Sequence, residues 1–333
     1  MPKYDIGGTR RREVNVREEL GQVAMVVHRY RSPRRWRRQV QVLRHLTLPP
    51  LPRGVRRPGE VWGVTVVRDE ADVLPLVLDH CFRQGFAHVL VADNRSVDGT
   101  REYLLDRQAR DPRLHVALDA EPAHFQSEKM TVLAHRAWRA GADWIVPFDA
   151  DEFWFARGRS VADHLRAQTT GQVWASFHHM VPTHVVEALA SDTEFVLDAT
   201  PSLPGKASGR AHPLLEIHPG NHFVTRVGGV SRGLFIAHAQ YRGPAQVARK
   251  VRQGAAASRL TGEDLSWFSP HWARAESLSD ADVADVWDNI SHGRPDDRLK
   301  FAATGPMVTV RPLGWQTWDP DDEVPPPASE DRP

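Results

Sequence analysis

The chain has 333 residues, 41% of them hydrophobic, which is enough for one large domain or two modest domains with a real core. It contains no apolar run of about 18 residues and no apolar segment near its N-terminus, so neither a transmembrane helix nor a secretory signal is expected. The single Cys81 excludes an internal disulfide, which fits a reducing, cytoplasmic compartment. It falls on the face of a predicted helix, so we expect it to be a small core residue.

The net charge of +1 conceals an uneven distribution. Residues 1–58 hold 15 Lys and Arg against 4 Asp and Glu, a net charge of +11, which leaves −10 on the rest. The run Arg31–Arg38 is typical of a contact with anionic lipid or nucleic acid, and the alternative is a solvated helix docked on the acidic remainder. Peripheral contact at the inner face of a membrane is therefore one hypothesis for this basic N-terminal extension.

Within the extension we expect poor order over residues 1–20, a strand over Val23–His28 and an Arg-rich helix over Arg34–Leu46. Prolines and glycines between Pro49 and Gly59 predict a linker that ends near residue 60.

From residue 61 onward, apolar segments typical of strands alternate with amphipathic segments typical of helices. The strand candidates are Val61–Val67, Ala87–Ala92, Leu114–Leu118 and Trp144–Phe148, and the helix candidates are Val73–Gln84 (capped by Asp72), Thr100–Arg110 and Gln126–Ala140. This alternation predicts an α/β fold with a mostly parallel sheet flanked by helices on both faces.

Three polar clusters follow these strand candidates, namely Arg68-Asp69-Glu70, Asp93–Thr100 and Asp149-Ala150-Asp151. Ligands of such folds bind beyond the carboxyl ends of the parallel strands. We therefore expect the three clusters to meet at one edge of the sheet.

The last cluster, which continues into Glu152, places three acids within four positions after a buried strand. Carboxylates this close repel one another unless a cation lies between them or one is protonated. Oxygen ligands of this kind suit Mg²⁺ or Mn²⁺, commonly together with substrate phosphates. A metal–diphosphate site is our hypothesis, and a solvated acidic turn is the alternative.

The second half is less regular. We expect a helix over Val161–Gln168, strands over Val173–His178 and Leu234–Ala239, loops with short strands over 180–232, and helices over Pro244–Ala257 and 276–292. The tail 319–333 is acidic and Pro-rich and is expected to be disordered. Neither a Gly-x-Gly-x-x-Gly fingerprint nor a phosphate-binding Gly-x-x-x-x-Gly-Lys-Ser/Thr loop follows the first strand.

The stretches Val64–Glu70, Asp93–Thr100 and Phe148–Phe153, in this order and spacing, resemble the family 2-type glycosyltransferases of the GT-A fold. The likeness is greatest to a bacterial subgroup that ends its motif in Asp-x-Asp-Glu-Phe. Gly220-Asn221-His222, His238–Arg242 and Lys250–Gly254 extend it over about residues 60–260, with Asp69 where many members have Asn.

The resemblance implies a GT-A-like mixed, mostly parallel sheet with a nucleotide-sugar-binding half over 59–179, an acceptor-binding half with metal and phosphate contacts over 180–275, and a helical region over 276–318. It implies Mn²⁺ or Mg²⁺ held by Asp149, Asp151 and His238. The nucleotide-sugar pocket would be formed by Asp69, Glu70, Asp93, Asn94, Asp98, Lys129, Asp149, Arg242 and Lys250.

The predicted reaction is an inverting transfer of a sugar from a nucleoside diphosphate to the hydroxyl of a glycan, a lipid-linked or a small-molecule acceptor. Inversion needs a general base opposite the leaving group, and the sequence leaves Glu152, Glu216, His218 and His222 as candidates. The alternatives are a nucleotidyltransferase and a non-catalytic sugar- or nucleic-acid-binding protein, although the acidic sheet edge argues against nucleic acid.

Overall fold

The computed structural model describes residues 15–52, 56–262, 274–275, 277–299, 301, 303 and 305–320. Residues 1–14 and 321–333, for which the sequence predicts poor order, lie outside this range, as do linker residues 53–55.

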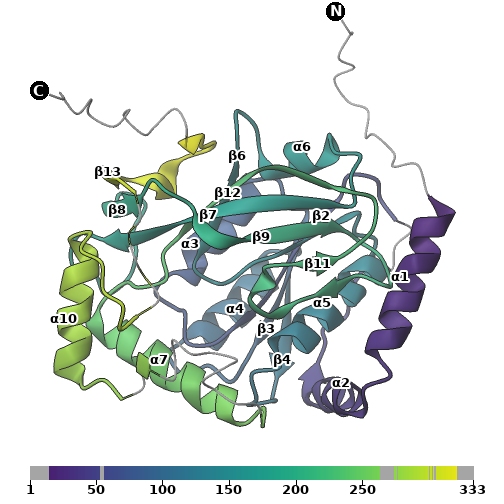
Figure 1. The fold of residues 1–333 in the computed structure, drawn as a ribbon, viewed down its shortest axis with the longest axis horizontal. Coiled ribbons are helices and arrows are strands. Elements are labelled where there is room, and N and C mark those ends of the chain that lie inside the picture. Colours follow the sequence, from purple (N-terminus) through teal and green to yellow (C-terminus); the bar gives the residue numbers. More distant parts are fainter. Residues whose placement is uncertain are drawn as a thin grey trace, which may run out of the picture.

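Four parallel strands form the first half of a large sheet (Figure 1). They are β2 (Val61–Val67), β3 (His88–Asp93), β4 (Leu114–Asp119) and β5 (Trp144–Pro147), joined by α3 (Leu74–Arg83), α4 (Thr100–Arg110) and α5 (Gln126–Ala140). Their spatial order is β4-β3-β2-β5, and every neighbouring pair is parallel. The predicted α/β class is confirmed, and each predicted strand and helix of this region is present.

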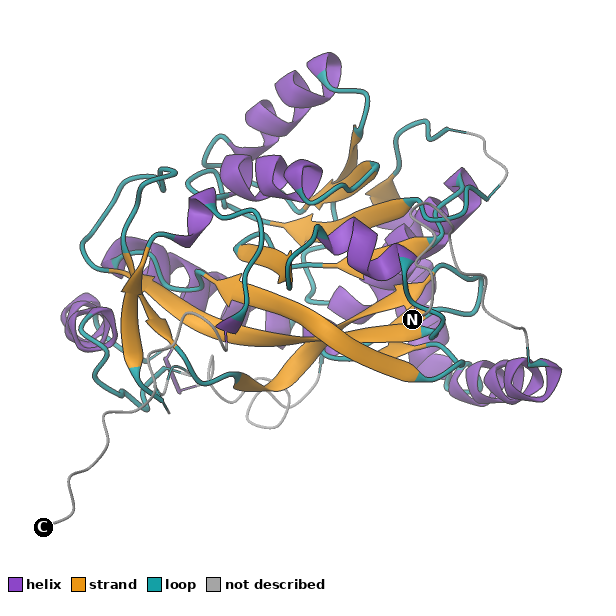
Figure 2. Cartoon of the chain, turned by 90° about the horizontal axis from the view of Figure 1, so that it is seen from above, coloured by secondary structure: helices purple, strands orange, loops and turns teal. Residues whose placement is uncertain are grey.

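Helices cover both faces of this parallel half, which explains why its strands read as continuous apolar runs. Val61 of β2 packs into the same core as Leu78 of α3, whereas its neighbour Trp62 packs into a second core with Leu133 of α5. Figure 2 shows the strands as a layer across the molecule with helices against it.

The second half of the chain extends the sheet with mixed pairing. The added elements are β6 (Glu152–Ala156), α6 (Val161–Arg166), β7 (Gln172–Pro182), β8 (Phe195–Asp198), β9 (Ser202–Arg210), β12 (Val230–His238) and β13 (Met307–Val310). The order continues β5-β9-β7-β12-β6, with β9 antiparallel to both of its neighbours and β12 parallel to β7.

The sequence underestimates β9, which spans nine residues inside the region expected to consist of loops and short strands. Pro204, Gly205 and Gly209 read as breakers there. Gly205 instead permits a close approach of two strands, because a Cβ on it would lie 2.4 Å from the Ala175 carbonyl oxygen of β7.

The N-terminal extension forms two helices, α1 (Val16–Arg29) and α2 (Pro33–His45). The predicted Arg-rich helix is confirmed, but the strand predicted over Val23–His28 is wrong. The poor order predicted up to residue 20 is also wrong from Val16 onward, where α1 begins. Asn15 caps α1 by accepting hydrogen bonds from the backbone N–H groups of Arg17 and Glu18. Gln22 then anchors the helix to the body by donating to the carbonyls of Leu214 and Thr225.

The C-terminal region adds α7 (Pro244–Arg259) and α10 (Asp280–Ser291), which pack together over a third core containing Val251, Val286 and Phe301. The remaining short elements are β1 (Leu46–Thr47), β10 (Glu216–Ile217), β11 (Val224–Thr225), η1 (Pro219–Asn221) and η2 (Pro312–Gly314). Among the described residues, none of the helices has both the length and the apolar character that a membrane crossing requires.

Candidate active site

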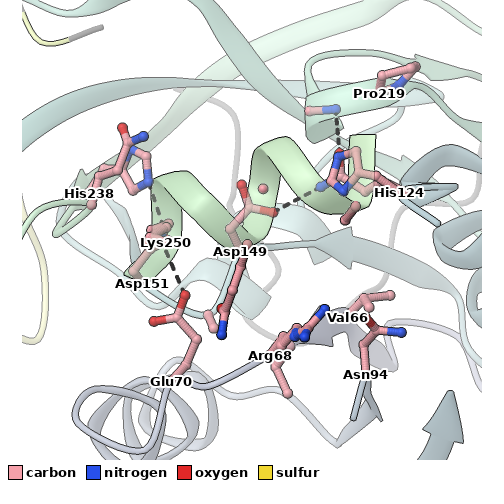
Figure 3. Close-up of a pocket in the computed structure, with 18 of the residues that line it drawn as sticks. Val66, Arg68, Glu70, Asn94, His124, Asp149, Asp151, Pro219, His238 and Lys250 are labelled. Carbon is pink, nitrogen blue, oxygen red and sulfur yellow. Dashed lines mark hydrogen bonds and ion pairs between the residues drawn. The ribbon is translucent and has the colours of Figure 1, made fainter. Parts of the chain in front are cut away.

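A pocket of about 850 Å³ opens at the carboxyl ends of β2, β3 and β5. All three polar clusters predicted to converge contribute to its lining, through Arg68, Asp69, Glu70, Asn94, Asp149 and Asp151. In Figure 3, Asp151, Glu70, His238 and Lys250 gather on one side of the pocket, and Arg68 and Asn94 lie on another. The parallel pairing of the strands brings these sequence-distant groups together.

Asp149 follows β5 by two positions and is held by three side chains. Lys206 of β9 places its Nζ 2.6 Å from Oδ2, while Asn221 donates to Oδ1 at 2.8 Å and Gln126 at 3.3 Å. The Asp149 side chain keeps 32% exposure toward the pocket. It is therefore a carboxylate of fixed orientation that a ligand can still reach.

Asp151 lies deeper and is surrounded by positive or protonatable groups. The Nε2 of His238 lies 3.2 Å from its Oδ1, Lys250 contacts its Oδ2, and Arg242 Nη1 lies 3.6 Å from Oδ2. Burial favours the neutral acid, but the charges of Lys250, His238 and Arg242 outweigh it and hold the pKa of Asp151 well below its usual range. Asp151 is therefore ionised at neutral pH.

Glu152 turns away from the pocket. Its Oε2 accepts hydrogen bonds from the Asp149 backbone N–H at 3.1 Å and from Trp154 Nε1 at 3.2 Å, and its Oε1 lies 2.8 Å from Lys206 Nζ. Burial, with help from the charge of Asp149, raises the pKa of Glu152. The side chain is fully buried and is absent from the lining, so its contacts shape the loop that carries the two aspartates.

Arg242, which follows β12, connects the two halves of the chain. Its guanidinium contacts Glu70 and lies 2.6 Å from Asp72 Oδ2, and Lys250 of α7 reaches Glu70 at 3.3 Å. Asp72 was expected to cap α3, but Val73 occupies the cap position and Asp72 bonds Arg242 instead. Arg242 is 1% exposed and does not line the pocket, so it supports Glu70 from behind.

Hydrogen bonds from backbone N–H groups to aspartate side chains tie the loops after β2 and β3 to each other. Asp69 adopts a positive φ of 55°, and its Oδ1 accepts from the Val97 N–H at 2.7 Å. Asp98 accepts from the N–H groups of Thr100 and Ala71, and Asp93 is held by Arg101 at 2.6 Å. Asp69 lines the pocket, whereas Asp93 and Asp98 do not and serve the loop structure.

Lys129 and Asn94 line the pocket and both contact the carboxylate of Asp119. Lys129 Nζ lies 2.6 Å from Asp119 Oδ2 and donates to the Glu121 carbonyl at 2.7 Å, while Asn94 donates to the same Asp119 carboxylate at 2.8 Å. Burial lowers the pKa of Lys129, and Asp119 opposes this effect. Both side chains are already engaged in a network that fixes the pocket wall.

The candidate bases of the second half separate in space. Glu216 and His218 lie outside the pocket lining, where Arg29 of α1 places its Nη1 2.6 Å from Glu216 and 3.3 Å from His218 Nε2. His222 lines the pocket, and its Nδ1 lies 3.0 Å from the Gly205 carbonyl oxygen. A carbonyl can only accept, so Nδ1 carries the proton and Nε2 is the basic nitrogen of the neutral ring.

The structure brings the three predicted metal ligands together only in part, because His238 and Asp151 are adjacent while Lys206 engages Asp149 and Lys250 contacts the other oxygen of Asp151. Two neighbouring ligands, each about 2.1 Å from Mg²⁺ at a right angle, lie about 3 Å apart, close to the His238–Asp151 separation. The Nδ1 of His238 and the Oδ1 of Asn221 are buried without a hydrogen-bond partner among the described residues. No group of three or more His, Cys, Asp or Glu side chains with metal-site geometry occurs in the described part of the chain, and Asp149 is engaged by Lys206.

Sequence reasoning missed Lys206, Gln126, Arg249 and Gln253, all of which line the pocket. Lys206 lies among residues that read as a loop, and Gln126 reads as an ordinary first-turn helix residue. Gln253 donates to Asp69 Oδ2 at 2.5 Å and Arg249 to the Asp69 carbonyl at 3.2 Å. Arg249 lies in the sequence beside Lys250 and Arg252, and this cluster of basic residues on one predicted helix is a signal that could have found it.

No protein-family model matches the chain, and no curated protein is significantly similar to it. Solved structures with a related arrangement include S. aureus TarS 1-349, at 10% identity over 74% of this chain and 98% of that chain, with a TM-score of 0.36. A mannosyltransferase from Pyrobaculum calidifontis, in complex with GDP-Man and Mn²⁺, matches at 16% identity over 82% and 84%, with a TM-score of 0.37. A 4-diphosphocytidyl-2C-methyl-D-erythritol synthase from Anaerococcus prevotii matches at 13% identity over 46% and 72%, with a TM-score of 0.28.

These likenesses are low in identity and in TM-score, so the activity of this chain is inferred from its own residues. The chain is an α/β protein with a pocket lined by acidic and basic side chains at the carboxyl edge of its parallel strands.

Proposed function

We propose that the protein is a metal-dependent, inverting glycosyltransferase that moves a sugar from a nucleoside-diphosphate sugar to an acceptor hydroxyl. One observation carries the proposal: Asp149 and Asp151 share a pocket with Lys250, Arg249 and Arg68 at the carboxyl edge of the parallel strands. Carboxylates suit a hard cation and basic side chains suit phosphates, so the two sets together fit a metal-bound diphosphate.

Arg68 adds support for an anionic ligand. Its buried Nε has no hydrogen-bond partner among the described residues, and the nearest carboxylate oxygen, on Asp69, is 3.9 Å away. A buried donor of this kind is costly unless a ligand satisfies it. A phosphate oxygen in the pocket would satisfy it.

For the metal we propose Mn²⁺ or Mg²⁺, held by Asp151 and His238, with Asp149 contacting either the metal or the ribose. When bound, such an ion neutralises charge on the diphosphate as it leaves. Lys250 contacts the second oxygen of Asp151 and is positioned to share that role. Asp69, Glu70 and Asn94 are proposed to contact the nucleoside, because they line the part of the pocket formed by β2 and β3.

For the general base we favour His222. Its Nε2 accepts the proton from the acceptor hydroxyl while the oxygen of that hydroxyl bonds to the anomeric carbon and the bond to the diphosphate breaks. Glu216 and His218 face α1 outside the pocket, and Glu152 is buried behind it. A glycan, a lipid-linked or a small-molecule acceptor remains compatible with this arrangement, and we propose that the reaction takes place in the cytoplasm.

A panel of nucleotide sugars, screened by thermal shift with and without Mn²⁺, tests the proposal. We expect one or a few nucleotide sugars to raise the Tm of the protein only when Mn²⁺ is present. The variants Asp151→Asn and His238→Asn should show no such rise. Asp106→Asn, an exposed carboxylate on α4, serves as the matched control and should retain it.

Two outcomes would contradict parts of the proposal. If EDTA left the affinity for the nucleotide unchanged, the proposed dependence on a metal would be wrong. Release of pyrophosphate, in place of a nucleoside diphosphate, would identify a nucleotidyltransferase instead.

A further inference from the structure

Helix α1 exposes a continuous apolar stripe to solvent. Val16, Leu20, Val23 and Val27 are 68%, 65%, 41% and 53% exposed. Their spacing of four, three and four residues places all of them on one face of the helix. An isolated exposed valine needs no explanation, but an aligned row of four does.

The opposite face of α1 is firmly attached to the body, so the stripe has a fixed orientation. Gln22 is fully buried and donates to the carbonyls of Leu214 and Thr225, at 2.8 and 2.9 Å. Glu19 pairs with Arg226 at 2.7 Å, and Arg29 pairs with Glu216 at 2.6 Å. Figure 1 shows α1 along one outer edge of the molecule, with α2 beside it.

Helix α2 repeats the pattern and adds positive charge. Trp36 and Leu43 are 57% and 46% exposed, and the half-buried Val40 lies between them at helical spacing. The segment 31–44 contains six arginines and no acidic residue. Four of these arginines are exposed on α2, namely Arg34, Arg35, Arg37 and Arg44.

This combination fits the surface of an anionic bilayer better than it fits another copy of the chain. Apolar side chains flanked by arginines and a tryptophan are typical of helices that lie in the membrane interface. Arginines near such a surface gain electrostatic attraction from anionic headgroups. A second copy docked through the same face would instead bring two arginine-rich helices together, at an electrostatic cost.

We propose that α1 and α2 form a docking surface for anionic membranes, with the α1 stripe and Trp36 entering the headgroup region and the α2 arginines contacting lipid phosphates. The sequence alone supplies only the charge of this segment. The outward row of apolar side chains is the observation that favours a bilayer over a solvated helix. The inference does not depend on the proposed activity.

Co-sedimentation of the full chain with phosphatidylcholine vesicles, with and without phosphatidylglycerol, tests the surface. We expect binding to the anionic vesicles that weakens as salt is raised. Leu20→Glu/Val27→Glu and Arg35→Glu/Arg37→Glu should each reduce it by at least about tenfold. The matched controls on α4, Leu105→Glu and Arg110→Glu, should bind as the unmodified chain does.

Unchanged Tm values would show that the exposed substitutions leave the fold intact. The proposal is overturned if neutral and anionic vesicles bind equally, if neither binds, or if the substitutions on α1 and α2 have no effect. Light scattering that shows a dimer in the absence of lipid, dissociated by Leu20→Glu/Val27→Glu, would overturn it in favour of an interface between copies.

Discussion

Lys206 and Asp149 form an ion pair at the floor of the pocket, with 2.6 Å between Nζ and Oδ2. The same ammonium group lies 2.8 Å from Glu152, and the Lys206 side chain is 4% exposed. The two carboxylates raise the pKa of Lys206 despite the opposing effect of burial, so the lysine is charged at neutral pH. The chain thus supplies its own cation between two of the three clustered acids.

Lys206→Met should lower the free energy of unfolding by about 3–5 kcal/mol, because it leaves two carboxylates without their counter-charge. Urea unfolding measures the change. The double variant Lys206→Met/Glu152→Gln should recover part of the loss, since the fully buried acid is then neutral. Equal stability of the single variant and the unmodified chain would show that Lys206 does not neutralise the pair.

Arg242→Leu should also destabilise the fold by about 3–5 kcal/mol, because Glu70, Asp72 and Asp151 all face its buried guanidinium. Arg252→Leu provides the comparison, because its pair with Asp280 is exposed on both sides. That variant should cost less than about 1 kcal/mol. Similar losses for the two variants in chemical denaturation would contradict the bridging role of Arg242.

Acid should destabilise the protein through His80 of α3, which is fully buried and whose Nε2 lies 2.6 Å from the Trp154 carbonyl oxygen. Burial lowers the pKa of His80 from 6.5 to about 4. The unfolded state therefore binds the extra proton first as the pH falls. The stabilisation is present above pH 6.5 and is lost toward pH 4, at up to about 1.4 kcal/mol per pH unit.

His80→Gln, which keeps a donor for the same carbonyl, should flatten the dependence of Tm on pH over this window. Other buried histidines contribute in the same direction, so the slope should decrease and not vanish. An unchanged slope would exclude His80 as one of its sources.

Gly220→Ala should impair catalysis by displacing His222. Gly220 has a φ of +70°, and a Cβ added there would lie 2.5 Å from His222 Cδ2. If His222 is the base, kcat should fall by about 10²-fold or more while nucleotide affinity is retained. Gly158→Ala is the control, because its φ is +63° but nothing lies within 4 Å of the added atom.

His222→Gln should reproduce the kinetic defect of Gly220→Ala without backbone strain. A full kcat in His222→Gln would refute its role as the base. An equal defect in Gly158→Ala would mean that strain alone, and not the histidine, explains the result.

The first half of the fold could be predicted because its signals are local. Val61–Val67 and Trp144–Pro147 are apolar runs that only a sheet covered on both faces can bury, and the intervening helices have clear ends. Parallel pairing then requires their carboxyl ends to share one edge. The lining positions of Asp69, Glu70, Asp149 and Asp151 follow from that geometry.

The second half could not be predicted in this way, because its strands depend on partners distant in the chain. In the sequence Gly205 indicates a strand breaker, but in the fold it allows β7 to pack closely against β9. Val23–His28 is typical of a strand in the sequence, but the hydrogen bonds of Gln22 to the body hold this segment as part of a helix. Glu216 and His222 are six positions apart, yet one faces α1 and the other lines the pocket.

The sequence by itself thus determined the α/β class, the edge where the acids gather and the charge of the N-terminal extension. Only the tertiary structure decided which basic groups neutralise Asp149 and Asp151, because Lys206 and Lys250 come from elements 57 and 99 residues further along the chain. Local patterns encode burial and strand periodicity, whereas an ion pair depends on how distant elements pack together.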